Sequence, residues 1–156
     1  MTEGKTRLIP AEQLFGNMLP LLEQGYEAEF TVTGNSMWPL LTHARDQVVI
    51  KKQPPRVGDV VLYCPKEGKY LLHRINRLKN GRFRAAGDAN CFHDGSFPVS
   101  CVVGTVIRIR RKGKWMEASC LALRWWSFWW NLLFFMRPAL LWLGRKIVAG
   151  KRRVCP

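Results

Sequence analysis

The strongest constraint on the fold is an alternation of polar and apolar residues that begins at Glu27. Residues 27–33 alternate in this way, which is typical of a half-buried strand. Further strands are expected at residues 47–51, 59–64, 70–78, 82–86 and 102–110. Asn80-Gly81 predicts a tight hairpin turn, and Gly58-Asp59 and Lys112-Gly113 are further turn signals. The sequence therefore predicts a mainly β body with short strands.

A helix is expected before the first strand, over residues 10–24. Pro10 suits the first turn of a helix, and Gly25 suits its end. Pro20 should kink or weaken this helix. Its apolar stripe consists of Leu14, Phe15, Met18, Leu21 and Leu22. We expect three units: an N-terminal helix (1–26), a β-rich domain (27–117) and a C-terminal segment (118–156).

The positive charge belongs mainly to the C-terminal segment. The formal net charge is +14, of which residues 108–156 contribute +11 from 12 Lys/Arg and one acidic residue. Such a charge requires an acidic partner or surface. The basic residues flank a nearly continuous Trp, Phe and Leu stretch, which nucleic-acid binding would leave unexplained. We therefore expect no nucleic-acid partner.

The C-terminal segment has the composition of a membrane-binding helix. Five of the seven tryptophans lie between residues 120 and 148, and the longest uncharged run has only 12 residues. A span needs roughly 20 apolar residues. Aromatic residues between Arg and Lys suit the headgroup region of a membrane, and Lys151-Arg152-Arg153 would add attraction to anionic lipid. A thin polar stripe recurs at helical spacing, at Cys120, Arg124, Ser127 and Asn131.

An interfacial helix is the expectation for this segment. A span stretched across Arg137 and Pro138, or a helix packed in a soluble core, remains an alternative. The five cysteines are odd in number and form no Cys-x-x-Cys pair, which argues against a disulfide framework and a zinc site. The first ten residues contain no apolar signal-peptide region. These features favour the cytoplasmic side of a membrane, although the face stays open.

The stretch VTGNSMWPLLTHARD, residues 32–46, presents a candidate nucleophile. Gly34 and Pro39 bracket a bend that carries Ser36. A serine hydroxyl is a poor nucleophile unless a base takes its proton, so Ser36 alone is equally a turn residue. His73 lies in the strand YLLHRI and is a candidate base or a core residue. Asp94 lies in a loop just past a strand end, and serine, histidine and aspartate can form an acyl-transfer site in any chain order.

The order of the motifs GNSMWPLL, VGDVVLY, LLHRI, GDAN and VVGTVI resembles that of type I signal peptidases. More widely it resembles the clan that these enzymes share with the self-cleaving LexA-type repressors. The resemblance covers about residues 30–110 and implies a signal-peptidase-like β fold. It implies Ser36 as the nucleophile. His73 stands where many bacterial members have a lysine base, which is similar to the endoplasmic-reticulum and archaeal branch. That branch also has an aspartate six residues after the Asp of its Gly-Asp-Asn-Asn box. The box aspartate corresponds to Asp88 here, and six residues after it this chain has Asp94.

Other positions follow or depart from the family pattern. Asp88 is expected to pair with Arg74 and to fix the strand that carries His73. Gly34 occupies a position where some members have an oxyanion-binding hydroxyl, so the oxyanion hole would consist of backbone N–H groups, including that of Ser36. The box Gly87-Asp88-Ala89-Asn90 has Ala for the first Asn of the family's box. The cleft is expected to be lined by Met37, Trp38 and Pro39. His43 and His93 are expected to be exposed loop residues.

The resulting hypothesis is a serine endopeptidase of signal peptidase type that works near a membrane surface. The resemblance implies an extended peptide or precursor-protein substrate with small side chains near the cleaved bond. We expect an anionic membrane as a partner, and neither a metal nor a cofactor. The alternative is a catalytically inactive β module that binds a membrane or a partner protein. A self-cleaving repressor is disfavoured, because no helix-turn-helix pattern precedes the β body.

Overall fold

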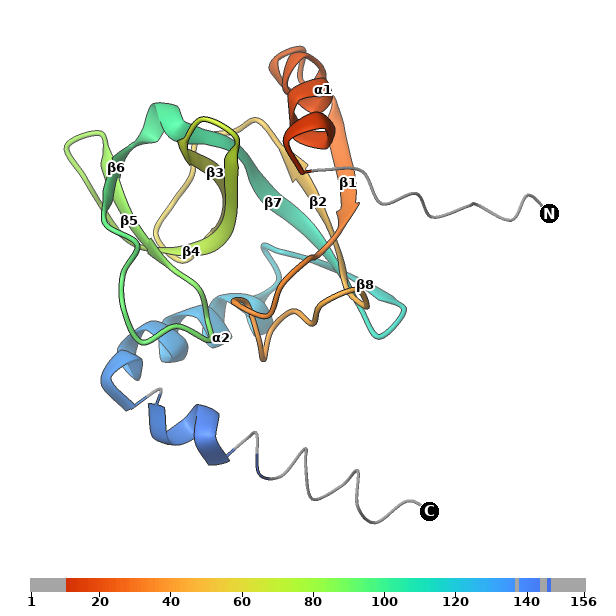
Figure 1. Cartoon of the computed structure of the whole chain (residues 1–156). Coiled ribbons are helices and arrows are strands. Elements are labelled where there is room, and N and C mark those ends of the chain that lie inside the picture. Colours follow the sequence, from red (N-terminus) through yellow and green to blue (C-terminus); the bar gives the residue numbers. More distant parts are fainter. Residues whose placement is uncertain (1–10, 137, 144–145, 147–156) are drawn as a thin grey trace.

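A computed structural model describes residues 11–136, 138–143 and 146. Pro10 and the basic residues Lys151, Arg152 and Arg153 lie outside the described residues. The described chain is mainly β with an N-terminal helix (Figure 1). Its elements are α1 (Ala11–Glu23), β1 (Glu27–Thr31), β2 (Gln47–Lys51), β3 (Val60–Lys66), β4 (Lys69–Lys79), β5 (Arg82–Ala86), β6 (Ser96–Pro98), the 3-10 turn η1 (Val99–Cys101), β7 (Val102–Arg111), β8 (Lys114–Glu117), α2 (Leu121–Leu132) and η2 (Phe134–Met136).

Helix α1 passes through Pro20 and ends at Glu23, and Gly25 caps it as the sequence predicts. Gly25 has a φ of 88°, the left-handed conformation that glycine adopts at no steric cost. Its N–H donates to the Leu22 carbonyl at 3.0 Å, and the next N–H, of Tyr26, donates to Leu21 at 3.0 Å. These two bonds form a Schellman motif, which satisfies carbonyls of the last turn.

The strands form a single antiparallel sheet in the order β1-β2-β7-β3-β4-β5-β6. Strand β8 pairs with the C-terminal part of β7, from Arg108 to Arg111. The hairpin predicted at Asn80-Gly81 is confirmed, and the turn signal Lys112-Gly113 also lies in a hairpin, between β7 and β8. Asn80 and Gly81 have φ of 51° and 67°, and Lys112 and Gly113 have φ of 50° and 81°. Two successive left-handed residues are the requirement of a type I′ turn, whose twist matches that of the flanking strands.

The strand predictions were wrong at three places. The first strand ends at Thr31 rather than residue 33, because the chain turns out of the sheet into the loop that carries Ser36. Strands β6 and β8 were not predicted. They are three and four residues long and mostly exposed, so neither shows the alternation on which the prediction depends.

Two apolar clusters lie on the two faces of the sheet. One includes Val60 and Leu62, and the other includes Val61 and Tyr63, so successive residues of β3 belong to opposite clusters. In the antiparallel pairing with β4, Val61 is opposite His73 and Val60 is opposite Arg74. Because directly opposed residues share a face, the side chains of His73 and Arg74 leave the strand on opposite faces of the sheet.

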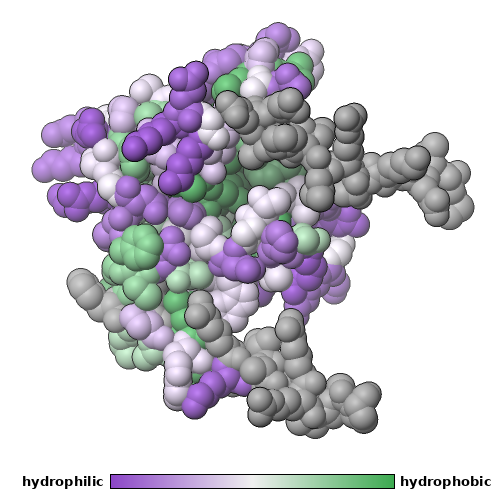
Figure 2. Space-filling view, viewed as in Figure 1, coloured by the Kyte–Doolittle hydropathy of each residue, from purple (hydrophilic) through white to green (hydrophobic). Residues whose placement is uncertain are grey.

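Helix α2 packs against the body and also leaves a hydrophobic side uncovered. Trp130 is buried, with 7% of its surface exposed. Four residues at helical spacing form what we call the apolar ridge, and each is 59–75% exposed: Leu121, Trp125, Phe128 and Leu132. Figure 2 shows hydrophobic residues gathered at the lower left of the view, where Figure 1 places α2. Within the described residues no helix is long and apolar enough to cross a membrane.

Candidate active site

The loop that carries Ser36 is closed at its base and anchored at its tip. At the base, the Val32 N–H donates to the Asp46 carbonyl at 2.9 Å. At the tip, Met37 is fully buried in the core, whereas Ser36 stays partly exposed. Trp38 and Pro39 are half-buried, and the peptide bond between them is cis. The neighbour Met37 therefore ties the loop to the core and leaves the Ser36 side chain at the surface.

The backbone before Ser36 needs a glycine. Gly34 has a φ of 84°, which a residue with a Cβ rarely adopts. Its N–H donates to His43 Nδ1 at 2.9 Å. His43 itself is exposed, as expected for a loop residue. The Gly34 amide is thus already engaged, which leaves other backbone amides of the loop, such as that of Ser36, as the candidate oxyanion donors.

Asp46 stabilises the end of the same loop. Its carboxylate is completely buried and accepts hydrogen bonds from the Arg45 guanidinium (2.8 Å), the Thr42 N–H (2.8 Å) and the Lys112 N–H (3.4 Å). Burial alone would raise the pKa of Asp46, but these hydrogen bonds outweigh it, so the pKa lies below its ordinary value. The carboxylate is therefore ionised in the folded protein near neutral pH.

His73 and Asp94 form a buried pair. His73 Nδ1 lies 2.5 Å from Asp94 Oδ2, and the histidine is only 4% exposed. If the carboxylate accepts this hydrogen bond, a neutral imidazole carries its hydrogen on Nδ1 and leaves Nε2 as the accepting nitrogen. The Asp94 N–H donates to the Ala85 carbonyl at 2.9 Å, which fixes the loop residue against β5. This contact favours the tautomer that a general base requires.

A tyrosine completes this pair. The Tyr63 hydroxyl donates to the same Asp94 oxygen at 2.8 Å. Burial, together with the adjacent Asp94 carboxylate, raises the pKa of Tyr63 well above its ordinary value. The hydroxyl therefore keeps its proton and acts only as a donor. Sequence reasoning missed this residue, because a tyrosine in a buried strand carries no signal that distinguishes it from core filling.

Arg74 and Asp88 form a second buried pair on the other face of the sheet. Arg74 Nε and Nη2 donate to the two Asp88 carboxylate oxygens at 2.9 and 2.8 Å, in a bidentate arrangement. The Trp130 indole N–H donates to the Asp88 carbonyl at 3.0 Å. The Arg74 guanidinium also reaches the Gly58 carbonyl at 2.8 Å and the Ser127 hydroxyl. Asp88 is thus held at its side chain by β4 and at its backbone by α2.

The turn that contains Asp88 supports the Ser36 loop. The Ala89 N–H donates to the Ser36 carbonyl at 2.8 Å. A Cβ on Gly87 would lie 2.5 Å from that same carbonyl oxygen, so only glycine fits there. Among the described residues, the Ser36 hydroxyl and His73 form no hydrogen bond. Hydrogen bonds between catalytic groups are often long without substrate and tighten in the reacting complex.

No described residues are arranged as a metal site, since no group of three His, Cys, Asp or Glu side chains lies together in the described ranges.

His93 is exposed, as expected, and its ring stacks on Phe134 with 4.5 Å between ring centroids. The ring therefore contacts the segment after α2, and His93 directly precedes Asp94 in the chain.

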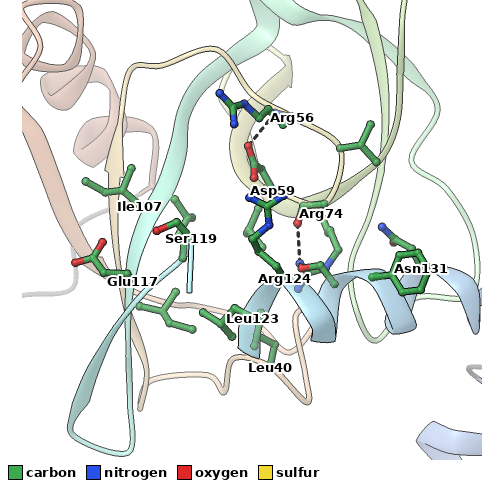
Figure 3. A pocket seen from close by; sticks show the side chains of 18 of the residues that line it. Leu40, Arg56, Asp59, Arg74, Ile107, Glu117, Ser119, Leu123, Arg124 and Asn131 are labelled. Atoms are coloured by element: carbon green, nitrogen blue, oxygen red, sulfur yellow. Dashed lines mark hydrogen bonds between the residues drawn. The ribbon is translucent and has the colours of Figure 1, made fainter. Parts of the chain in front are cut away.

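A cavity of about 830 Å³ lies next to α2 (Figure 3). It is bounded by α2, the loop before β3, and β7, and none of Ser36, His73 and Asp94 lines it. Burial raises the pKa of Asp59 in this cavity. The Arg56 N–H, which donates to Asp59 at 2.8 Å, and nearby guanidinium groups offset the rise only in part. The cavity therefore adjoins Arg74 and Ser127, although it does not include the three residues of the candidate triad.

No protein-family model matches the sequence, and comparison with curated proteins finds no significant match.

Proposed function

We propose that this chain is a serine endopeptidase of signal peptidase type, with Ser36 as nucleophile, His73 as general base and Asp94 as the residue that orients the base. The observation that supports it best is the buried contact of 2.5 Å between His73 Nδ1 and Asp94 Oδ2. A carboxylate on Nδ1 presents Nε2 as the proton acceptor and stabilises the imidazolium that forms. The second Asp94 donor, Tyr63, holds the carboxylate in place.

The proposed reaction is peptide-bond hydrolysis in two steps. Ser36 Oγ attacks the carbonyl carbon of an extended peptide while its proton passes to His73 Nε2. Backbone N–H groups, including that of Ser36, stabilise the oxyanion, and losing one such donor typically costs about 3 kcal/mol in the barrier. His73 then protonates the leaving amine. In the second step, water gives a proton to His73 Nε2 and attacks the acyl carbon. His73 then returns that proton to Ser36 Oγ as the C–Oγ bond breaks, which releases the acid product and restores Ser36 and His73.

The substrate and the location follow from the resemblance and from α2. The resemblance favours a precursor protein or signal-peptide-like segment with small residues near the cleaved bond. The apolar ridge favours an interfacial membrane position for α2, because four large apolar side chains on one helix stripe are left in water. The net charge of +11 on residues 108–156 favours an anionic membrane surface. The unpaired cysteines favour its cytoplasmic side.

A cleavage assay tests the proposal. Wild type, Ser36→Ala and His73→Ala would be compared in detergent and in lipid vesicles, on precursor peptides with small residues before the scissile bond. His93→Ala serves as the matched histidine control, because its ring lies outside the pair. We expect cleavage by wild type and by His93→Ala, and none by the other two. A folded His73→Ala protein as active as wild type would refute the assignment of the base.

The alternative is a catalytically inactive β module, which the apolar ridge also supports because membrane binding needs no nucleophile. It predicts that wild type and Ser36→Ala bind anionic vesicles equally and that neither cleaves any precursor. Both functions predict that Trp125→Glu on the ridge weakens vesicle binding and that added salt weakens it further. Tight binding to oligonucleotides instead of vesicles would contradict both.

A further inference from the structure

Helix α2 contacts the sheet next to the residues proposed for catalysis. Three of its side chains make polar contacts with the body, all from the helix side opposite or beside the apolar ridge. Ser127 meets the Arg74 guanidinium, and Trp130 Nε1 donates to the Asp88 carbonyl at 3.0 Å. Asn131 Oδ1 accepts from the Asn76 side-chain amide at 3.0 Å. Figure 3 shows Arg74 directed from the sheet toward α2, which carries Asn131.

Helix α2 contacts Arg74 and Asp88, and each of these residues is linked to one half of the candidate site. Arg74 directly follows His73 in β4, so its position sets that of the general base. Asp88 directly precedes Ala89, whose N–H donates to the Ser36 carbonyl at 2.8 Å. Both Arg74 and Asp88 are buried, with exposed fractions of 2% and 0%. A shift of this pair would therefore be transmitted to the strand of the base and to the loop of the nucleophile.

Water would weaken this arrangement if α2 were absent. The ion pair is strong only while it is excluded from solvent, since charge attraction falls as the local dielectric rises. Trp130 covers the Asp88 carbonyl, and Ser127 covers one Arg74 nitrogen. Because α2 also carries the exposed apolar ridge, the surface proposed to meet lipid and the support of the site belong to one helix.

Resting on the proposed function, we propose that α2 is a positioning element of the peptidase site and that Trp130 and Ser127 are its positioning residues. Neither touches the reacting atoms. They act through Asp88 and Arg74, which hold the Ser36 loop and the His73 strand in register with each other. Loss of these contacts is expected to slow bond cleavage without changing the surface that receives the peptide.

A pair of tryptophan variants on this one helix tests the proposal. Trp130→Phe removes the indole N–H but keeps an aromatic ring in the buried position. Trp129→Phe makes the same change at the neighbouring exposed position. Both would be measured in detergent, full length, for kcat and KM on a cleaved precursor peptide. Removing one hydrogen bond predicts a fall of about fivefold to tenfold in kcat for Trp130→Phe with little change in KM. Trp129→Phe should match wild type.

Hydrogen exchange at the Ala89 amide gives a second readout that does not depend on turnover. A positioning role predicts faster exchange at Ala89 in Trp130→Phe than in Trp129→Phe, whereas a general loss of stability would raise exchange across the core. If Trp130→Phe does not fold, the smaller change Ser127→Ala carries the same two predictions. Wild-type kcat and unchanged Ala89 exchange in these variants, with wild type active, would overturn the positioning role alone. A wild-type protein that cleaves nothing would overturn the proposed function and the positioning role together.

Discussion

Replacing Asp88 by Asn tests how much the buried ion pair with Arg74 contributes to the stability of the site. Both side chains are almost out of water, at 0% and 3% exposed, and two hydrogen bonds of 2.8 and 2.9 Å join them. Asn has nearly the shape of Asp but no charge, so the variant leaves the guanidinium buried without its counter-ion. Breaking a buried pair from one side costs about 3–5 kcal/mol.

The loss is large against the total stability of a domain, about 5–15 kcal/mol. At roughly 2–4 °C per kcal/mol for a chain of this size, the melting temperature should fall by about 6–20 °C. Urea unfolding followed by tryptophan fluorescence measures the free energy directly. A double-mutant cycle with Arg74→Gln should show that the second change costs much less once the first is made, because the neutral pair leaves no isolated charge.

A surface pair supplies the matched control. Glu27 accepts from Arg108 at 2.7 Å, but these side chains are 40% and 41% exposed. Glu27→Gln makes the same change from carboxylate to amide, and a solvated pair contributes only about 0–1 kcal/mol. If Asp88→Asn lowers the free energy of unfolding no more than Glu27→Gln does, burial is not the reason that the Arg74–Asp88 pair stabilises the fold.

Three further outcomes follow from single contacts. Gly87→Ala places a Cβ 2.5 Å from the Ser36 carbonyl oxygen, so unfolding experiments should show a loss of about 1–3 kcal/mol and cleavage assays a lower rate. Tyr63→Phe removes one donor from the Asp94 carboxylate, a bond worth about 1.5–3 kcal/mol, and kcat should fall by roughly tenfold or more in the same assay. The folded pKa of Asp46 is lowered, so its stabilisation is present above the ordinary aspartate range near pH ~4 and is lost as pH falls through the folded value. The free energies of unfolding of wild type and Asp46→Asn, measured in urea, should therefore become equal only at acid pH.

The parts of the fold that local chemistry determines were predictable from the sequence. Gly25 ends a helix and Asn80-Gly81 turns a hairpin because both need left-handed backbone, a requirement that few residues other than glycine and asparagine meet easily. Strand β8 was not predictable, since its four residues are mostly exposed and carry no alternation. Its existence follows from pairing with the C-terminal part of β7, which is a tertiary contact.

The candidate site, like the fold, could be predicted from the sequence only in part. The pair His73 and Asp94 was proposed from the resemblance, and the two side chains are in contact. The polar stripe of α2 was visible as a period of three and four residues, but periodicity does not say what a stripe faces. That Ser127 meets Arg74 depends on how the chain folds back over a sequence separation of 53. Tyr63 reaches Asp94 across 31 residues for the same reason.

The alternation of β4 explains why neighbouring residues serve the site from opposite sides. His73 lies on the face that holds Tyr63, and Arg74 lies on the face that α2 covers. A slip of one residue between β3 and β4 would exchange these faces, placing the Arg74 guanidinium on the side of Asp94 and moving His73 away from it. A polar group that has a partner only in the correct register is the best-attested use of a buried ion pair. Arg74 meets Asp88, Gly58 and Ser127 in the observed register, so the ion pair on one face of the sheet fixes His73, the proposed base, on the other face.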